Sequence, residues 1–309
     1  MLRTTVALVS AILISACVRD EAPATTQEPE LVATVSGFET PESVRWDAAR
    51  NVFYVSNVTG NPGQKDGNGY ISRVRSDGTI DSLRFIAGGR TGVTLHSPKG
   101  MFLQGDTLWV TDIDAVRAFD VTAGAPLVSV DLSRDGAIFL NDITRAPDGT
   151  MYVSDTRFVF GDSGVTHESP DRVYRIAADR AVSIAVEGDT LGMPNGVFWD
   201  DEGQRLIIAA LGPPRIFEWQ PGGGDPRLIA AGPGGYDGVE SAGGGRFLLS
   251  AQDDSSLSIL KNGTVTKVVG GIPSPGDIGW DPRQRLVFVP LLNANEVRIF
   301  RLPEELQEM

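Results

Sequence analysis

The stretch PNGVFWDDEGQRLIIAA, residues 194–210, carries the plan of the whole chain: a polar head, an apolar run, a turn and a second apolar run. The opening of this plan occurs six times, at intervals of 57, 42, 54, 42 and 40 residues. Spacings near 40 residues, lengthened twice by insertions, are typical of β-propeller blades. The openings read PESVRWD, SPKGMFL, LNDITRA, PNGVFWD, YDGVESA and GDIGWDP, and their polar heads are Glu42, Lys99, Asn141, Asn195, Asp237 and Asp277.

Further apolar runs follow each opening. They are short, rich in β-branched and aromatic residues, and separated by Gly, Asp, Asn and Pro, which predicts strands and turns. Each repeat holds four runs, except that the sixth ends after three, while LVATVSG (31–37) precedes the first repeat. A strand over 31–37 that pairs with 297–300 would close the ring and leave no open edge. The sequence therefore predicts an all-β, six-bladed β-propeller over residues 30–309, with the N-terminal strand closing the last blade.

The composition fits this fold and excludes one class of partner. The chain has 309 residues, of which 36 are Gly and 19 are Pro, as suits a turn-rich domain. Its 40 Asp and Glu outnumber 27 Lys and Arg, for a formal net charge of −13. Because negative charge repels phosphate backbones, we expect no nucleic-acid partner. We expect a monomer that acts on a small-molecule substrate.

The first residues predict a compartment. MLRTT is a short basic start, VALVSAILIS is an apolar run too short to span a bilayer, and ISAC (14–17) has the form of a bacterial lipoprotein cleavage site. We expect residues 1–16 to be a signal peptide, Cys17 to carry lipid and residues 17–29 to form a tether. Val18 favours the outer membrane, facing the periplasm, with membrane contact only through the lipid anchor. The alternative is an ordinary secretory signal in which Cys17, the only cysteine, is incidental.

Four of the openings, in this order at blade spacing, resemble those of the senescence marker protein/gluconolactonase (regucalcin-like) family. The matching tripeptides are PES around Glu42, LND around Asn141, PNG around Asn195 and YDG around Asp237. The resemblance covers roughly residues 30–300. It implies that Glu42, Asn195 and Asp237 bind one divalent cation at the axis, with Asn141 as a further ligand or a substrate contact. It also implies that Asp237 is the general base.

The residue types alone point to the same chemistry. Two carboxylates and two amide carbonyls are hard oxygen ligands, which suit calcium or magnesium, with manganese as another alternative. Zinc prefers His and Cys, which the six heads lack. A cation with three or four protein ligands keeps positions for water and substrate, and can polarise a carbonyl oxygen. The competing interpretation is that these side chains cap strand ends and line a water-filled channel.

Two heads remain less settled. Lys99 is an unusual neighbour for a cation, and we favour an ion pair with Asp112 or with Asp277 across the axis. The alternative is that Lys99 holds a substrate carboxylate or an oxyanion. Asp277 is a candidate for a further cation ligand.

Two long loops are expected on the face where the heads gather. They run over 58–69 and 156–172, and long loops on a binding face usually carry specificity or form a lid. His167 lies in the second loop, and His96 precedes Lys99 by three residues. Each histidine could relay protons, but an exposed loop histidine is the favoured interpretation.

One position departs from the family pattern. Relatives that hydrolyse sugar lactones often carry Arg two residues before the ND asparagine, and this chain has Phe139 there. An apolar wall suits a more hydrophobic ester, lactone or organophosphate. Two functions stay open: a calcium-dependent hydrolase with Asp237 as general base or nucleophile, and a non-catalytic binding propeller on the cell envelope with a structural calcium.

Overall fold

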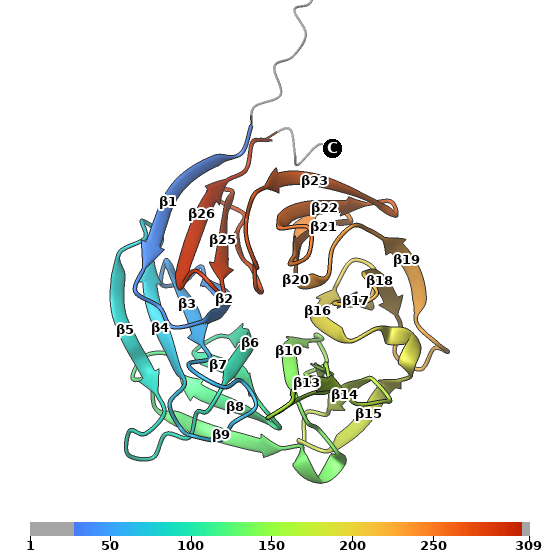
Figure 1. The fold of residues 1–309 in the computed structure, drawn as a ribbon, viewed down its shortest axis with the longest axis horizontal. Coiled ribbons are helices and arrows are strands. Elements are labelled where there is room, and N and C mark those ends of the chain that lie inside the picture. Colours follow the sequence, from blue (N-terminus) through green and yellow to red (C-terminus); the bar gives the residue numbers. More distant parts are fainter. Residues whose placement is uncertain (1–27, 305–309) are drawn as a thin grey trace, which may run out of the picture.

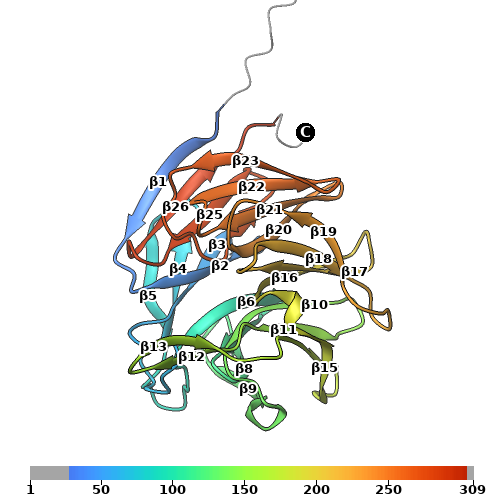
Figure 2. The ribbon, with the colours of Figure 1, turned by 45° about the vertical axis from the view of Figure 1, so that its right-hand side comes forward.

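The computed structural model describes residues 28–304 and arranges them as six four-stranded antiparallel sheets around a central axis (Figures 1 and 2). The prediction of a six-bladed β-propeller is confirmed. The predicted signal peptide, Cys17 and nearly all of the tether lie outside the described residues. Within 28–304 no helix has the length and apolar character needed to cross a membrane.

The first three blades follow one another in chain order, with the first strand of each at the axis. Blade one holds β2 (Pro41–Asp47), β3 (Val52–Asn57), β4 (Tyr70–Arg75) and β5 (Ile80–Ala87). Blade two holds β6 (Pro98–Gln104), β7 (Thr107–Asp112), β8 (Ala115–Asp120) and β9 (Pro126–Asp131). Blade three holds β10 (Leu140–Arg145), β11 (Met151–Asp155), β14 (Arg172–Ile176) and β15 (Val182–Glu187).

The remaining blades continue the ring. Blade four holds β16 (Pro194–Asp200), β17 (Arg205–Ala210), β18 (Arg215–Trp219) and β19 (Arg227–Ala231). Blade five holds β20 (Tyr236–Gly243), β21 (Arg246–Ala251), β22 (Ser256–Lys261) and β23 (Thr264–Gly270). Blade six holds β24 (Gly279–Asp281), β25 (Leu286–Leu291), β26 (Glu296–Arg301) and β1 (Glu30–Ser36). A separate hairpin joins β12 (Phe158–Gly161) to β13 (Gly164–His167), and two 3-10 turns cover Ser133–Asp135 and Asp189–Leu191.

The N-terminal strand closes the ring, as the missing fourth run predicts. β1 pairs antiparallel with β26, so that Glu30 lies opposite Arg301 and Ser36 lies opposite Glu296. Figure 1 shows the two strands side by side, blue against red. Blade six therefore combines the two ends of the described chain.

Burial explains why the second strands read as unbroken apolar runs. Every residue of β3 (VFYVSN) is buried, because the strand lies between the neighbouring blades. The outer strand β5 instead alternates between partly covered and exposed positions along most of its length. The core is divided into clusters between adjacent blades, such as the one that packs Phe53 of blade one on Phe288 of blade six. Strands with two covered faces need apolar residues at successive positions, whereas one-sided strands alternate.

The glycines of the PNG and YDG openings serve close approach between blades rather than a turn. They lie inside β16 and β20, where a Cβ on Gly196 would come 2.2 Å from the backbone oxygen of Asp237. A Cβ on Gly238 would come 2.6 Å from Asp277 Oδ1. No side chain fits at such distances, so the neighbouring inner strands can approach this closely only with glycine at these positions.

The sixth opening is shifted by one residue relative to the sequence alignment. In the first five blades a bulge follows the first residue of the inner strand, and Pro41 for example lies opposite Asn57. In blade six Pro275 takes that place, opposite Leu291. Gly276 is therefore the counterpart of Glu42, and Asp277 lies one step deeper along the axis. The expectation that Asp277 shares the position of the other five heads is wrong.

Candidate active site

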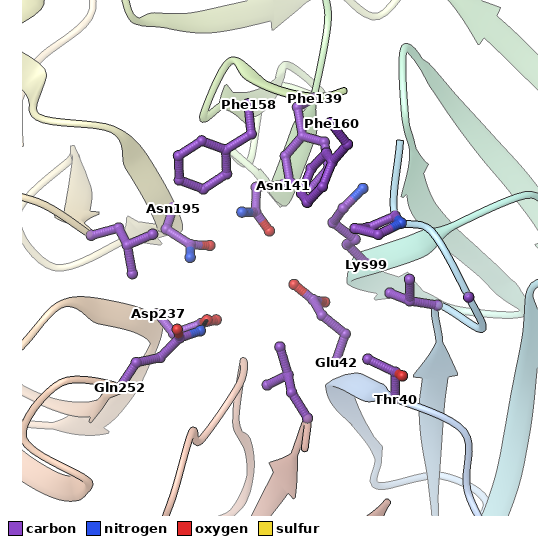
Figure 3. A pocket seen from close by; sticks show the side chains of 15 residues that line it. Thr40, Glu42, Lys99, Phe139, Asn141, Phe158, Phe160, Asn195, Asp237 and Gln252 are labelled. Atoms are coloured by element: carbon purple, nitrogen blue, oxygen red, sulfur yellow. Dashed lines mark hydrogen bonds between the residues drawn. The ribbon is translucent and has the colours of Figure 1, made fainter. Parts of the chain in front are cut away.

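A cavity of about 250 Å³ lies at the axis, on the face where the inner strands begin (Figure 3). Its floor is polar because the second residues of five inner strands point into it, and its walls are apolar. The floor residues are Glu42, Lys99, Asn141, Asn195 and Asp237, with Gln252 beside them. The apolar wall residues are Val58, Pro62, Phe139, Phe158, Phe160, Leu211 and Leu292, and Thr40 and Gly60 complete the lining.

The two carboxylates of the floor are buried and incompletely paired. Glu42 Oε2 and Asp237 Oδ1 have no hydrogen-bond partner, whereas Asp237 Oδ2 accepts from Gln252 Nε2. Burial, and then the charge of Asp277, raises the pKa of Asp237 to about 8. Burial, followed by the charges of Asp237 and Asp277, raises the pKa of Glu42 well above its usual range. Both carboxylates would be stabilised in their charged form by a cation.

The two amides are positioned by their neighbours. Asn141 Nδ2 donates to Thr156 Oγ1 at 2.9 Å, and Thr156 Oγ1 donates in turn to the backbone oxygen of Pro194 at 2.8 Å. Because the amide nitrogen of Asn141 is held in this way, its oxygen is left to face the middle of the cavity (Figure 3). The Asn195 side chain is buried, and its amide lowers the pKa of Asp237 against the larger effect of burial, which raises it.

The donors of the floor fit a hard divalent cation. Within residues 28–304 no group of three or more His, Cys, Asp or Glu side chains could hold a metal by itself. A cation would therefore depend on the amide oxygens of Asn141 and Asn195 together with Glu42 and Asp237. Oxygen donors of both kinds are typical ligands of calcium and magnesium, and the unpaired carboxylate oxygens are free to serve.

The ion pair favoured for Lys99 is absent from the described residues. Asp112 accepts instead from Arg117 Nε and from backbone N–H groups at the start of blade two. Asp277 accepts from Ser43 Oγ at 2.6 Å and does not line the cavity. The prediction that Lys99 forms an ion pair with Asp112 or Asp277 is therefore wrong.

Lys99 faces the cavity. Its Nζ lies 3.9 Å from the centroid of the Phe139 ring and donates to the backbone oxygen of Ser97 at 3.3 Å. The residue is only 2% exposed. Burial lowers the pKa of Lys99 to about 8, although the nearby Glu42 acts in the opposite direction. An ammonium with one backbone partner and an aromatic face is available to bind negative charge on a ligand.

A second polar layer lies below the floor. Arg45 on β2 pairs with Glu240 on β20 and lies 3.6 Å from Asp277. Burial, and then the charge of Asp277, raises the pKa of Asp142, which also accepts from the backbone N–H of Val197 at 2.8 Å. This layer holds three carboxyl groups and one guanidinium, and a cation above it would favour the ionised form of the carboxyl groups.

The two histidines fasten loops and do not line the cavity. His96 Nδ1 accepts from the backbone N–H of Gly67 at 3.0 Å, which ties the blade-one loop to blade two. His167 Nε2 lies 2.7 Å from Asp171 Oδ1, at the base of the β12–β13 hairpin. His167 is exposed, as the favoured interpretation expects, whereas His96 is partly buried, which that interpretation did not expect.

Sequence reasoning missed several residues in and around the cavity. Val58, Leu211, Gln252 and Leu292 each follow the second strand of a blade by one residue, and Thr156 holds the same place in blade three. These positions could have been predicted from the repeat, because they recur with the same spacing as the second residues of the inner strands. Phe158 and Phe160 belong to the hairpin inserted in blade three, whose strands the repeat plan does not contain.

Comparisons with known proteins agree with this architecture. Residues 40–218 match the SMP-30/Gluconolactonase/LRE-like region, a range that includes Glu42, Asn141 and Asn195 and ends before Asp237. Among curated proteins no significant match is found.

Three solved structures illustrate the likeness in fold. A candidate gluconolactonase is 19% identical, with a TM-score of 0.67 over 90% of this chain and 93% of that chain. A gluconolactonase from Xanthomonas campestris is 18% identical, with a TM-score of 0.62 over 91% and 97%. A chain from a nidogen/laminin complex is 17% identical, with a TM-score of 0.61 over 77% and 84%. Identities this low show a shared fold only, but the sequence match to the family region covers more than half of the chain. The protein therefore belongs to the SMP-30/gluconolactonase/LRE-like family.

Proposed function

We propose that the protein is a metal-dependent hydrolase of a small lactone or ester. The observation that carries the proposal is the pair of buried carboxylates, Glu42 and Asp237, each with an unpaired oxygen on the polar floor of a cavity whose walls are mostly apolar. Membership of a family that includes gluconolactonases supports the reaction class. Calcium is the cation we favour, since the donors are all oxygen.

Glu42, Asn195, Asp237 and Asn141 would hold the cation. When bound, the cation supplies Lewis-acid polarisation of the substrate carbonyl. Thr156 orients Asn141 through the 2.9 Å hydrogen bond described above, so the donor set is organised before a ligand arrives.

Asp237 has a chemical role beyond ligation in this proposal. Gln252 holds its Oδ2, which leaves Oδ1 to take a proton from water or to attack the acyl carbon. Either role requires the ionised carboxylate. Lys99, whose ammonium lies in the same cavity, is placed to stabilise negative charge that develops on the substrate oxygen.

The test measures hydrolysis of aryl esters, aliphatic and sugar lactones, and phosphotriesters, with calcium and with chelator. Asp237→Asn keeps the shape and one ligating oxygen, so it should fold yet lose activity by on the order of 100-fold or more, as removal of general-base catalysis does. Asp201→Asn, an exposed aspartate in the turn after β16, is the matched control. If calcium binds and no substrate is turned over above the Asp237→Asn level, the protein is a binding propeller with a structural cation.

A further inference from the structure

Three phenylalanine rings form one wall of the cavity. The centroid of Phe139 lies 5.2 Å from that of Phe160 and 5.8 Å from that of Phe158, and the last two rings are 6.4 Å apart. Figure 3 shows the three rings grouped on one side of the polar floor. Phe139 comes from blade three, whereas Phe158 and Phe160 come from β12 of the inserted hairpin.

The hairpin and the blade-one loop meet over the cavity. A Cβ built on Gly63 would lie 3.2 Å from Phe160 Cδ2, so the two insertions are in contact. The blade-one loop is held to blade two by an ion pair between Lys65 and Asp114. The apolar wall is therefore fixed on both sides before a ligand enters.

The hairpin is also fastened at its base. Arg157 Nη1 donates to the backbone oxygen of Gly136 at 2.9 Å, and His167 pairs with Asp171 as described. A binding site that is already formed loses less conformational entropy when a ligand binds.

The walls and the floor suit different parts of a ligand. Lys99 and the four candidate cation ligands gather on the floor, and the wall side chains, apart from the hydroxyl of Thr40, carry no hydrogen-bonding group. A ring bearing several hydroxyls would leave them without partners against the phenylalanines, which is unfavourable. An aryl or short alkyl group would gain from burial there. The volume of about 250 Å³ is slightly below the usual range for drug-sized ligands, so the substituent must be compact.

We propose that the substrate is a lactone or ester with one compact apolar substituent, such as a phenyl group, which lies against Phe139, Phe158 and Phe160 while the carbonyl group faces the floor. The proposal rests on the hydrolase function proposed above. It assigns substrate choice to a hairpin inserted between the second and third strands of blade three.

The test compares three lactones that share a five-membered ring, in calcium: γ-butyrolactone, γ-phenyl-γ-butyrolactone and ribono-1,4-lactone. The phenyl lactone should have a kcat/KM larger than that of γ-butyrolactone by a factor on the order of 10 to 100, the scale of a hydrophobic pocket, and ribono-1,4-lactone should be the poorest. Phe158→Ala and Phe160→Ala should each lower the ratio of phenyl to unsubstituted lactone by on the order of 10-fold. Val159→Ala is the control, because alternation along β12 places Val159 on the opposite face.

The outcomes separate this inference from the function on which it rests. If the lactones are hydrolysed and the phenyl substrate has no advantage, or the ribonolactone is preferred, the hydrolase proposal stands and the apolar subsite is refuted. If none is hydrolysed and the aryl esters and other members of the wider panel give no turnover either, the hydrolase proposal fails, and calorimetry with the non-hydrolysable γ-phenyl-γ-butyrolactam decides on the subsite. Binding that weakens in Phe160→Ala would support the subsite, and absence of binding to the wild type would overturn it.

Discussion

Removal of the divalent cation should make the stability of the protein fall as the pH rises. Without a cation, the buried carboxyl of Asp237 has its pKa raised from 3.8 to about 8, and the pKa of Glu42 is shifted in the same direction. The unfolded chain releases the Asp237 proton near pH 4, whereas the folded protein keeps it until about pH 8. Between these values the folded state binds more protons, so its stability decreases with increasing pH.

The size of the effect follows from Asp237 alone. A shift from 3.8 to about 8 is about four units, and at about 1.36 kcal/mol per unit it amounts to on the order of 5 kcal/mol. For a domain of this size, this corresponds to a melting temperature lower by on the order of 10 °C at pH 8 than at pH 4. The pKa of Lys99 is lowered to about 8, so this residue affects the stability only above pH 8, where it makes the stability increase with pH.

The assay is thermal unfolding of the purified protein between pH 4 and 8, in chelator and in excess calcium. The gap between the two melting temperatures should widen as the pH rises, because calcium stabilises the ionised carboxylates. In chelator, Asp237→Asn should reduce the slope of melting temperature against pH but not abolish it, since Glu42 remains. The exposed control Asp201→Asn should leave this slope unchanged. A chelated wild type whose melting temperature is constant over this range, or an Asp237→Asn variant with the wild-type slope, would refute the reasoning.

Three further results are expected. A chain that starts at Pro41 should aggregate or melt well below one that starts at Glu28, because β26 is left as an open edge; equal melting temperatures would mean that blade six does not need β1. Wild-type cells supplied with radioactive fatty acid should label the protein and cells with Cys17→Ser should not, so equal label in both would rule out lipidation at this cysteine. Lys99→Met should bind calcium more tightly by a factor on the order of 10, since one positive charge leaves the cavity, and should turn substrate over more slowly; titration calorimetry with unchanged calcium affinity would place the ammonium away from the cation.

The repeats predict the fold because blade spacing and strand alternation are local properties of the chain. The floor follows from them, as five of the six aligned heads line one cavity. The alignment failed at Asp277 because it matched acidic side chains, whereas Pro275, which pairs with Leu291, marks the start of the inner strand of blade six. Proline opens the inner strands at Pro41, Pro98 and Pro194 as well, so aligning the prolines would have placed Gly276 opposite Glu42. The partner of Lys99 was wrong for a similar reason, since Arg117 from the same blade already occupies Asp112.

The walls could be predicted only in part. Phe139 was recognisable by its place before Asn141, but Phe158 and Phe160 reach the cavity through a hairpin that folds back from blade three toward the axis (Figure 3). Where an inserted hairpin lies depends on contacts such as Gly63 with Phe160, between loops almost 100 residues apart. Insertions of this kind have no repeat partner from which their position can be inferred.

The strand that closes the ring also determines the face of the propeller at which the upstream chain joins the domain. β1 ends at Ser36, next to the face where β2 begins and the cavity lies, so its first residue, Glu30, lies at the opposite face of the ring. A lipid at Cys17, or a resin coupled to the same end, would therefore be connected to the domain at the face opposite the cavity. The opening of the cavity lies on the face opposite to that attachment, so the attached end does not cover it.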